Sequence, residues 1–528
     1  MQRLDPRLVL LLPALAALLV HARALGGDYV WLDHTHLEEG AALAGSDGVA
    51  ALFQRGFAGT GYYRPLTALS LSLDAALWNT PFGFRLVTLA WHALAACMTS
   101  LAARRLGLSS RAGLLAGLIV AVHPAGSLVA DAIAFRSESM IAVCLLGLVM
   151  AHLARRPALA GLALAAGALT KETALVLGPL LVFALEAKGV FSKEQPREPF
   201  TLRVKLYGAE LAGLVLAGTL RLLYAPHWRA PFPALPLGEQ LGTRLAAFAR
   251  STALLLAPVD GTICDASPVV SLASGAALVG LVALVLTCYL AYRERNIGPL
   301  FALALLPSLG LVPAMRLWSP HYLYVPLTFG AMLVAGALDR RERLLVPVAA
   351  TAGVVWSLLS FTQAARYLDD EALFRPEVER RPECREAQFF LGEVARLRKD
   401  WDGAAARYEA AIRENPRVLA YVDRGAALQN LGAARFAQSR LAEAERAWTL
   451  ALDLSREPAQ RERLRSNLAA ATLRAGRPED TVRLLTDDVS GPNPLPESLL
   501  LMAAALRQLG HEPEALALAD RYRRARSP

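Results

Sequence analysis

The chain has 528 residues, of which 55% are hydrophobic and 19% are charged, and its mean hydropathy of +0.36 is too high for an ordinary soluble protein. The net charge of +9 would suit a nucleic-acid-binding protein, but much of the Lys and Arg excess lies in short loops between apolar runs, where it sets membrane orientation. We therefore expect a membrane protein that binds no nucleic acid.

The N-terminal stretch has two possible interpretations. Residues 1–27 combine a basic start, an apolar run and an A-x-A pattern at Ala22 and Ala24. Such a stretch can be a cleaved signal peptide or a first spanning helix. Both place Asp33 on the far side of the membrane, so the expectations for the rest of the chain do not depend on the choice.

Long apolar runs continue through the first two thirds of the chain and predict about eleven membrane helices of roughly 17–20 residues each. The runs lie at 8–25, 84–103, 111–130, 138–154, 157–170, 173–187, 207–224, 273–292, 298–313, 323–338 and 344–361. If these helices alternate in direction, five basic loops share one side, which the positive-inside rule assigns to the cytoplasm. Those loops contain Arg104–Arg105, Arg155–Arg156, Lys188 to Lys205, Arg293–Arg295 and Arg340–Arg343.

The opposite side then receives the long loops 26–83 and 225–272, together with short turns near 131–137, 171–172 and 314–322. Because eleven is an odd number, the C-terminal part of the chain also falls outside. Residues 244–257 are apolar but carry Arg244 and Arg250, so we interpret them as an amphipathic helix on the outer interface.

The fold class predicted from these patterns is all-α. A multi-pass membrane domain over 1–365 is followed by a linker at 366–385 and by a tetratricopeptide-repeat α-solenoid over 386–523. The first repeat is indicated by Leu391–Gly392, Ala404, Tyr408, Ala411 and Pro416, and the pattern recurs near 431, 468 and 502. A plain helical bundle is the alternative. Repeat stacks of this kind bind extended peptides, so a protein or peptide partner is expected outside the membrane.

The outer turns carry an unusual number of paired cations and carboxylates, which are costly at the ends of membrane helices unless paired or functional. Such a set suits a site that holds an anionic lipid headgroup beside a general base. Structural alternatives remain: Arg64 can snorkel, Lys171 and Glu172 can form a helix-end ion pair, and His123 can cap a helix. The candidate residues are Asp33, Arg64, His123, Arg136, Glu138, Lys171, Glu172 and His321.

The five cysteines are scattered without a C-x-x-C pair, so no zinc site is expected. A disulfide between Cys264 and Cys384 is geometrically possible but is not favoured. A divalent metal beside Asp33 and the neighbouring histidines is possible but unsupported, because a D-x-D-type pair is absent. We therefore predict no metal site.

Several segments, in this order, resemble the transmembrane and tetratricopeptide-repeat-containing O-mannosyltransferases and their bacterial relatives. The segments are YVWLDHTHL, YYRPLTALSLSLD, FRLVTLAWHALAA, HPAGSLVADAIAFRSE, LTKETAL, LLAPVDGTICDAS and HYLYVP. The resemblance covers nearly the whole chain, including the C-terminal repeats. It implies the GT-C glycosyltransferase fold and transfer of a sugar, mannose being one option, from a polyprenyl-phosphate donor to a protein hydroxyl on the non-cytoplasmic side.

The resemblance also implies roles for single residues. Asp33 corresponds to the acid of the first outer loop and is the expected catalytic base, acting with inversion at the sugar carbon. Lys171 and Arg136 would be the cations on the phosphate side. The other matches are Arg64 in Y-R-P, His123 in H-P, Glu138 after Arg136, and Glu172 in K-E.

The chain departs from the family pattern at several positions. Leu32 stands where the family has a second acid, Gly126 and Leu128 follow H-P in place of His and Glu, and His321 replaces an Arg. Asp131, one helical turn after Leu128, could replace the lost acid.

These losses favour an alternative function, a non-catalytic membrane-anchored scaffold whose repeats recruit proteins. The Ala-, Leu- and Arg-rich composition is typical of a bacterium with a GC-rich genome, so we expect the inner membrane with the repeats in the periplasm. An endoplasmic-reticulum lumen fits the same topology.

Overall fold

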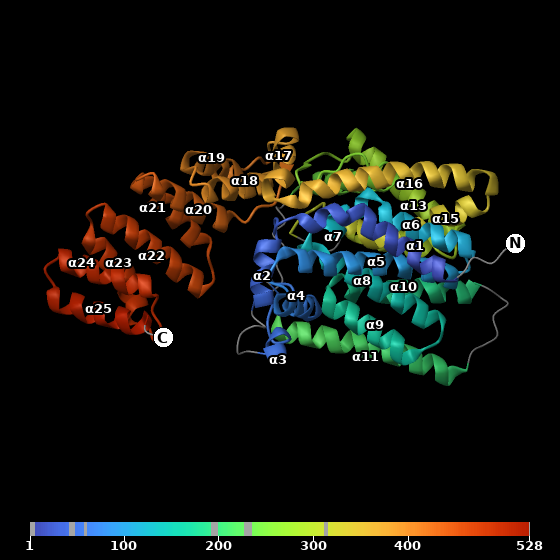
Figure 1. The fold of residues 1–528 in the computed structure, drawn as a ribbon, viewed down its shortest axis with the longest axis horizontal. Coiled ribbons are helices and arrows are strands. Elements are labelled where there is room, and N and C mark those ends of the chain that lie inside the picture. The colour runs from blue at the N-terminus through green and yellow to red at the C-terminus, as the bar shows by residue number, and fades with distance from the viewer. Residues whose placement is uncertain are drawn as a thin grey trace. The chain divides into compact units, whose positions relative to one another are not determined.

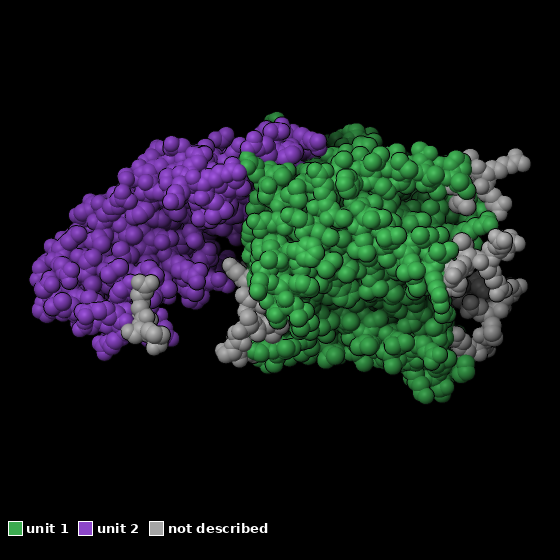
Figure 2. Space-filling model, in the orientation of Figure 1, with its two compact units in different colours: residues 1–373, 417–419 green, residues 374–416, 420–528 purple. Residues whose placement is uncertain are grey.

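The computed structural model describes residues 6–41, 48–57, 61–191, 199–225, 235–310 and 315–526, and nearly all of the regular structure in these ranges is helical (Figure 1). The predicted all-α class is therefore confirmed. The chain forms two compact units, coloured separately in Figure 2. Unit 1 comprises 1–373 with 417–419, and unit 2 comprises 374–416 with 420–528, so the division falls inside the 366–385 segment expected as a linker.

Unit 1 is an assembly of helices of very different lengths. Its helices are α1 (Pro6–His21), α2 (Asp33–Ala41), α3 (Gly48–Leu52), α4 (Pro65–Leu77), α5 (Pro81–Arg105), α6 (Ser110–Val122), α7 (Ser127–Asp131), α8 (Arg136–Leu153), α9 (Pro157–Thr170), α10 (Thr173–Phe191), α11 (Phe200–Tyr224), α12 (Leu237–Leu256), α13 (Gly275–Arg293), α14 (Gly298–Ala304), α15 (Tyr324–Asp339) and α16 (Glu342–Ala364). Short 3₁₀ turns join several of them, at Ala22–Gly26, Pro124–Gly126, Ile133–Phe135, Leu306–Leu309, Pro320–Leu323 and Ala365–Leu368. The strands β1 (Ser267–Pro268) and β2 (Val418–Leu419) pair in antiparallel register within this unit.

Seven stretches of the described chain are long and apolar enough to cross a membrane, which supports a multi-pass membrane protein. A bent pair, Ser110–Val122 with Pro124–Asp131 at 57°, would make an eighth. The seven are Arg7–Gly26, Pro81–Arg105, Ile133–Leu153, Phe200–Tyr224, Gly275–Arg293, Pro320–Asp339 and Val346–Leu368.

This number is smaller than the eleven predicted from the apolar runs. The run at 157–170 forms the 14-residue α9, the run at 173–187 lies within the 19-residue α10, and the run at 298–313 begins as the seven-residue α14. By length and composition, the described residues therefore hold seven or eight candidate spans where the apolar runs predict about eleven. An odd number of spans would place the C-terminal unit on the outer side, and an even number would place it in the cytoplasm. Because the structure gives seven or eight candidate spans, their number does not decide on which side this unit lies.

Two helices of unit 1, α9 and α11, pack through glycines. A Cβ on Gly161 would lie 2.4 Å from the carbonyl oxygen of Ala209, and a Cβ on Gly213 would lie 2.4 Å from that of Gly161. Glycine at both positions lets the two backbones touch, as in the small-residue contacts of membrane helices. The two helices run side by side in Figure 1.

Unit 2 consists of helix pairs that follow one another along the chain. After α17 (Asp370–Arg380), which begins in unit 1, come α18 (Arg385–Leu397), α19 (Trp401–Ile412), α20 (Arg424–Ala437), α21 (Leu441–Leu454), α22 (Pro458–Arg474), α23 (Pro478–Ser490), α24 (Pro496–Gln508) and α25 (Glu512–Arg526). Each helix from α18 to α25 contacts the next. A Cβ on Gly392 would lie 2.6 Å from the Tyr408 ring, and one on Gly432 would lie 2.4 Å from the Trp448 ring. The predicted small-residue anchors therefore sit where the paired helices approach most closely, while the assignment to tetratricopeptide repeats remains a prediction.

The cysteines differ in their chemical state. Cys264 and Cys384 are each disulfide-bonded, whereas Cys97, Cys144 and Cys288 are free.

Candidate functional site

The start of α8 gathers several of the predicted site residues. In the preceding turn, the Ala134 amide donates to Oδ1 of Asp33 at 2.7 Å. The ring of Phe135 lies 4.9 Å from that of Trp31 and 4.8 Å from that of His321. Residues 133–138 therefore connect the first outer loop with the later segments 171–172 and 316–321.

The centre of the site is Glu138, in the first turn of α8. Lys171 donates to its Oε1, and Nε2 of His321 lies 3.6 Å from the same oxygen. All three side chains are buried. The His321 distance is longer than a hydrogen bond. Burial lowers the pKa of Lys171, and the Glu138 carboxylate opposes that shift.

The neighbouring residue, Glu172, makes a second ion pair. Nε and Nη2 of Arg64 donate to its two carboxylate oxygens at 3.0 and 2.5 Å, and the guanidinium lies 4.3 Å from the centre of the Tyr62 ring. Although burial alone would raise it, the pKa of Glu172 is lowered because Arg64 stabilises the carboxylate. The predicted ion pair between Lys171 and Glu172 is thus replaced by two pairs that join distant segments.

Asp33 is the first residue of α2 and is 0% exposed. Besides the bond from Ala134, its Oδ2 accepts from the Val30 amide at 3.2 Å. Burial raises the pKa of Asp33, and Arg85 and the two amides oppose that shift. Each carboxylate oxygen has two lone pairs, so Asp33 keeps the capacity to accept one further hydrogen bond on each oxygen.

Arg136 lies apart from the Glu138 cluster, by which we mean Arg64, Glu138, Lys171, Glu172 and His321. Its guanidinium is fully buried and pairs with Asp74 at 2.5 Å. It also donates to Thr88, Ser70 and the carbonyl of Phe84. These contacts tie α4 and α5 to α8, and the role of Arg136 as a phosphate-side cation stays a prediction.

His123 and Asp131 are also held elsewhere. Nδ1 of His123 accepts from the Ala125 amide at 3.1 Å, and its Nε2 lies 3.2 Å from the carbonyl oxygen of Leu255. His123 therefore caps a helix, which was one of its two interpretations. Asp131, considered as a substitute for the missing acid, is buried and pairs with Nδ1 of His21 in α1 at 2.8 Å.

Two residues beside the Glu138 cluster were absent from the predicted set. The Arg316 guanidinium lies 5.3 Å from the centre of the Trp31 ring. His36 packs against Phe57, and burial lowers its pKa to about 3, so the ring is neutral. Its Nδ1 is one of the buried atoms in the described ranges that have no hydrogen-bond partner. The spacing of Asp33 and His36 could have revealed the latter, because residues three apart share a helix face.

The arrangement offers cations, a neutral imidazole and carboxylates from four segments of the chain. No three His, Cys, Asp or Glu side chains in the described ranges are placed to hold a metal ion. Arg and Lys at this density can bind a phosphate if their carboxylate partners give way.

Comparison with known proteins adds a limited similarity. No family model matches the chain. A stretch of 140 residues, 25% of the chain, is 32% identical to protein O-mannosyl-transferase Tmtc1 of Drosophila melanogaster. The match covers 16% of that protein, so the chain spans far less than two thirds of its relative. This similarity is thus limited to one stretch of each protein.

Proposed function

We propose that this protein is an integral-membrane glycosyltransferase that moves a sugar, with mannose as the first candidate, from a polyprenyl-phosphate donor to a protein hydroxyl on the non-cytoplasmic side. The observation that carries the proposal is the Glu138 cluster, in which Arg64 and Lys171 are buried beside Glu172, Glu138 and His321. Its residues fall in the segments that resemble the O-mannosyltransferases, and the match to Tmtc1 supports the same class of reaction.

In the proposed reaction the acceptor oxygen attacks the anomeric carbon, its proton passes to Asp33, and the bond between the sugar and the phosphate oxygen breaks with inversion. The leaving phosphate keeps the electron pair and is stabilised by Lys171 and Arg64, with Arg136 as a more remote cation. A raised pKa suits Asp33 to this role, because a more basic carboxylate takes a proton from a hydroxyl more readily.

The site is assigned to an oxidising compartment. Disulfide bonding of Cys264 and Cys384 supports this assignment for both the second outer loop and the C-terminal unit, since disulfides persist in the periplasm or the endoplasmic-reticulum lumen. The bacterial inner membrane, with the repeats in the periplasm, is the location that we propose. The repeats would there present the acceptor protein to the site.

Transfer by purified protein, assayed with a panel of polyprenyl-phosphate sugars, tests the proposal. Asp33→Asn keeps a carbonyl oxygen for the Ala134 amide but removes the base, so we expect turnover to fall by about 10²- to 10⁴-fold. Wild-type turnover in this variant would exclude Asp33 as the base.

A second candidate function is a membrane-anchored scaffold. It is favoured by the complete burial of Asp33 and its two hydrogen bonds from backbone amides, which equally suit a residue that only stabilises the fold. A scaffold tolerates Asp33→Asn and Lys171→Ala, provided that the protein folds. It loses partner recruitment when residues 386–523 are deleted. An enzyme instead loses sugar transfer when either Asp33→Asn or Lys171→Ala is introduced.

A further inference from the structure

The loop that carries Asp33 contacts the end of the last candidate membrane span and the residues that follow it. The Asp28 amide donates to the carbonyl of Leu368 at 2.8 Å. A Cβ on Gly27 would lie 2.5 Å from the carbonyl oxygen of Tyr367, so this approach requires glycine. Residues 27–28 and 367–368 therefore meet backbone to backbone, although more than three hundred residues separate them in the sequence.

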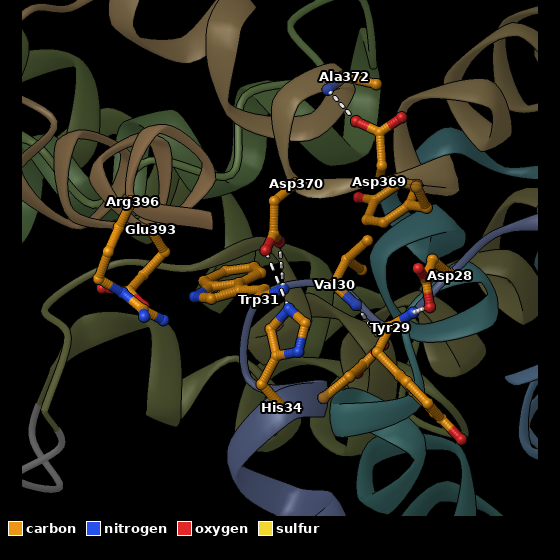
Figure 3. A network of polar contacts seen from close by, with 12 residues as sticks. Asp28, Tyr29, Val30, Trp31, His34, Asp369, Asp370, Ala372, Glu393 and Arg396 are labelled. Atoms are coloured by element: carbon orange, nitrogen blue, oxygen red, sulfur yellow. Dashed lines mark hydrogen bonds and ion pairs between the residues drawn. The ribbon is translucent and has the colours of Figure 1, made fainter. Parts of the chain in front are cut away.

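The strongest connection is made by Asp370, the first residue of α17 (Figure 3). Its Oδ1 accepts from the Trp31 amide at 2.6 Å, and its Oδ2 pairs with Nε2 of His34 at 2.9 Å. Figure 3 shows the carboxylate reaching both groups at once. Because Trp31 and His34 lie on either side of Asp33, Asp370 holds the turn from both ends.

This turn needs an outside restraint. Trp31 has a φ of +56°, a left-handed conformation that bulky residues rarely adopt. The turn is closed by the Asp33 amide, which donates to the Val30 carbonyl at 2.9 Å. A strained turn persists only where its surroundings fix it. The bond from the Trp31 amide to Asp370 supplies such a contact at the strained residue itself.

Arg85 of α5 reinforces the junction. Its guanidinium donates to the carbonyls of Tyr367 at 2.8 Å and Asp131 at 2.5 Å, and also to that of Asp28. The buried Arg85 guanidinium thereby connects the loop to the segment 365–370 and to the core of unit 1.

We infer that Asp370 is a positioning residue, which sets the place of Asp33 by fixing the turn through Trp31 and His34. The expected effect on catalysis rests on the proposed function, whereas the contact between Asp370 and the turn does not. Asp370 is the first residue of α17, a helix that continues past Leu373 into unit 2.

The test uses the full chain in detergent and compares Asp370→Ala with Asp369→Ala. Asp369 is a matched control because its carboxylate accepts from the Ala372 amide at 2.8 Å, at the start of the same helix. We expect Asp370→Ala to speed hydrogen–deuterium exchange of residues 28–36 and to lower kcat by about 10- to 100-fold, because small misplacements of a reacting group are costly. Affinity for a polyprenyl-phosphate should stay unchanged. Asp369→Ala should change neither exchange in the loop nor kcat.

Asp370→Asn provides the rescue, since its amide oxygen can still accept from the Trp31 amide, and it should restore kcat to near the wild-type value. Equal effects of Asp370→Ala and Asp369→Ala, or unaltered exchange of 28–36 in Asp370→Ala, would overturn the inference. So would faster exchange with unchanged kcat. If wild-type protein transfers no sugar, the proposed function fails, whereas the exchange measurement still decides whether Asp370 fixes the turn.

Discussion

The two ends of α8 carry buried ionic clusters that balance their charges in the same way but use their hydrogen bonds differently. At the N-terminal end, the Glu138 cluster sets Arg64 and Lys171 against Glu138 and Glu172. At the C-terminal end, the His152 cluster consists of His152, Arg155, Glu186 and Glu210. There His152 lies 2.7 Å from Glu210 and 2.8 Å from Glu186, and Arg155 lies 2.6 Å from Glu186.

Both nitrogens of His152 contact carboxylates, and Nη1 of Arg155 also lies 3.2 Å from Nε2, so both ring nitrogens are used in polar contacts. In the Glu138 cluster, His321 lies beyond hydrogen-bond distance of Glu138, and the nearby His36 has a buried nitrogen without a partner in the described structure. Both clusters are therefore buried and charged. Among the described residues, only the Glu138 cluster, the proposed binding site, has hydrogen-bonding groups nearby that are not already used, whereas the His152 cluster uses its groups to hold helices together.

The largest effect is expected from Glu138→Ala. It leaves Lys171 buried without its partner, which costs about 3–5 kcal/mol of unfolding free energy, and it abolishes transfer. Thermal unfolding in detergent measures the first effect and a donor-turnover assay measures the second. The double variant Glu138→Gln with Lys171→Met has no unpaired charge, so it should recover much of the stability but no activity. Wild-type transfer by the double variant would show that the cluster only holds the fold.

His152→Ala should affect stability alone. It removes two charge-assisted hydrogen bonds, which we expect to cost about 3 kcal/mol after allowing for the partial exposure of Glu186. Turnover per folded molecule should remain at the wild-type value. A fall in kcat in this variant, with folding controlled by size-exclusion chromatography, would remove the functional distinction between the two ends of α8.

A matched pair of Arg→Lys substitutions compares the two ends of α8 while keeping the positive charge at each. Arg64→Lys loses the two-pronged contact to Glu172 and the packing on Tyr62, so we expect about 1–2 kcal/mol of lost stability and roughly tenfold slower transfer. Arg155→Lys keeps a single contact to the partly exposed Glu186 and should cost about 0–1 kcal/mol. Equal effects of the two substitutions, measured by the same unfolding and turnover assays, would contradict a special role for Arg64.

The last prediction concerns stability alone, and it uses a carboxyl outside both clusters to separate burial from ion pairing. Burial raises the pKa of Asp265 to about 8, even though its oxygens accept from the Leu317 and Trp318 amides. The folded state then binds more protons than the unfolded state between pH 4 and 8, so stability should fall as pH rises through this range. Unfolding temperatures should decrease toward pH 8 in the wild type. Asp265→Asn should show a flatter profile, and identical slopes would exclude this source of pH dependence.

Much of the fold could be predicted from the sequence because hydropathy and small-residue spacing are local signals. The apolar runs located the membrane helices, and Gly392 and Gly432 lie at close helix contacts as their spacing indicated. The number of spans is harder to predict, because an apolar run such as 157–170 indicates burial but not how long the helix will be.

The sequence could indicate which residues gather at the site but not how they pair. The outer turns supplied Glu138, Lys171, Glu172 and Arg64, which the structure brings together, but the sequence could not say which cation meets which carboxylate. Arg64 and Glu172 are 108 residues apart, and their pairing depends on how α4 and α9 pack. Asp370 gave no signal at all, because an acid at the start of a helix is common for capping and charge reasons alone.

The glycine contact between α9 and α11 has a consequence for how the protein is made. With 14 residues, α9 is about 21 Å long, whereas the hydrocarbon core of a bilayer is about 30 Å thick. The 25-residue α11, which is long enough to span, is synthesised after it. Because α11 follows α9 in the sequence, the glycine contact that packs α9 against a spanning helix can form only after α11 has been synthesised.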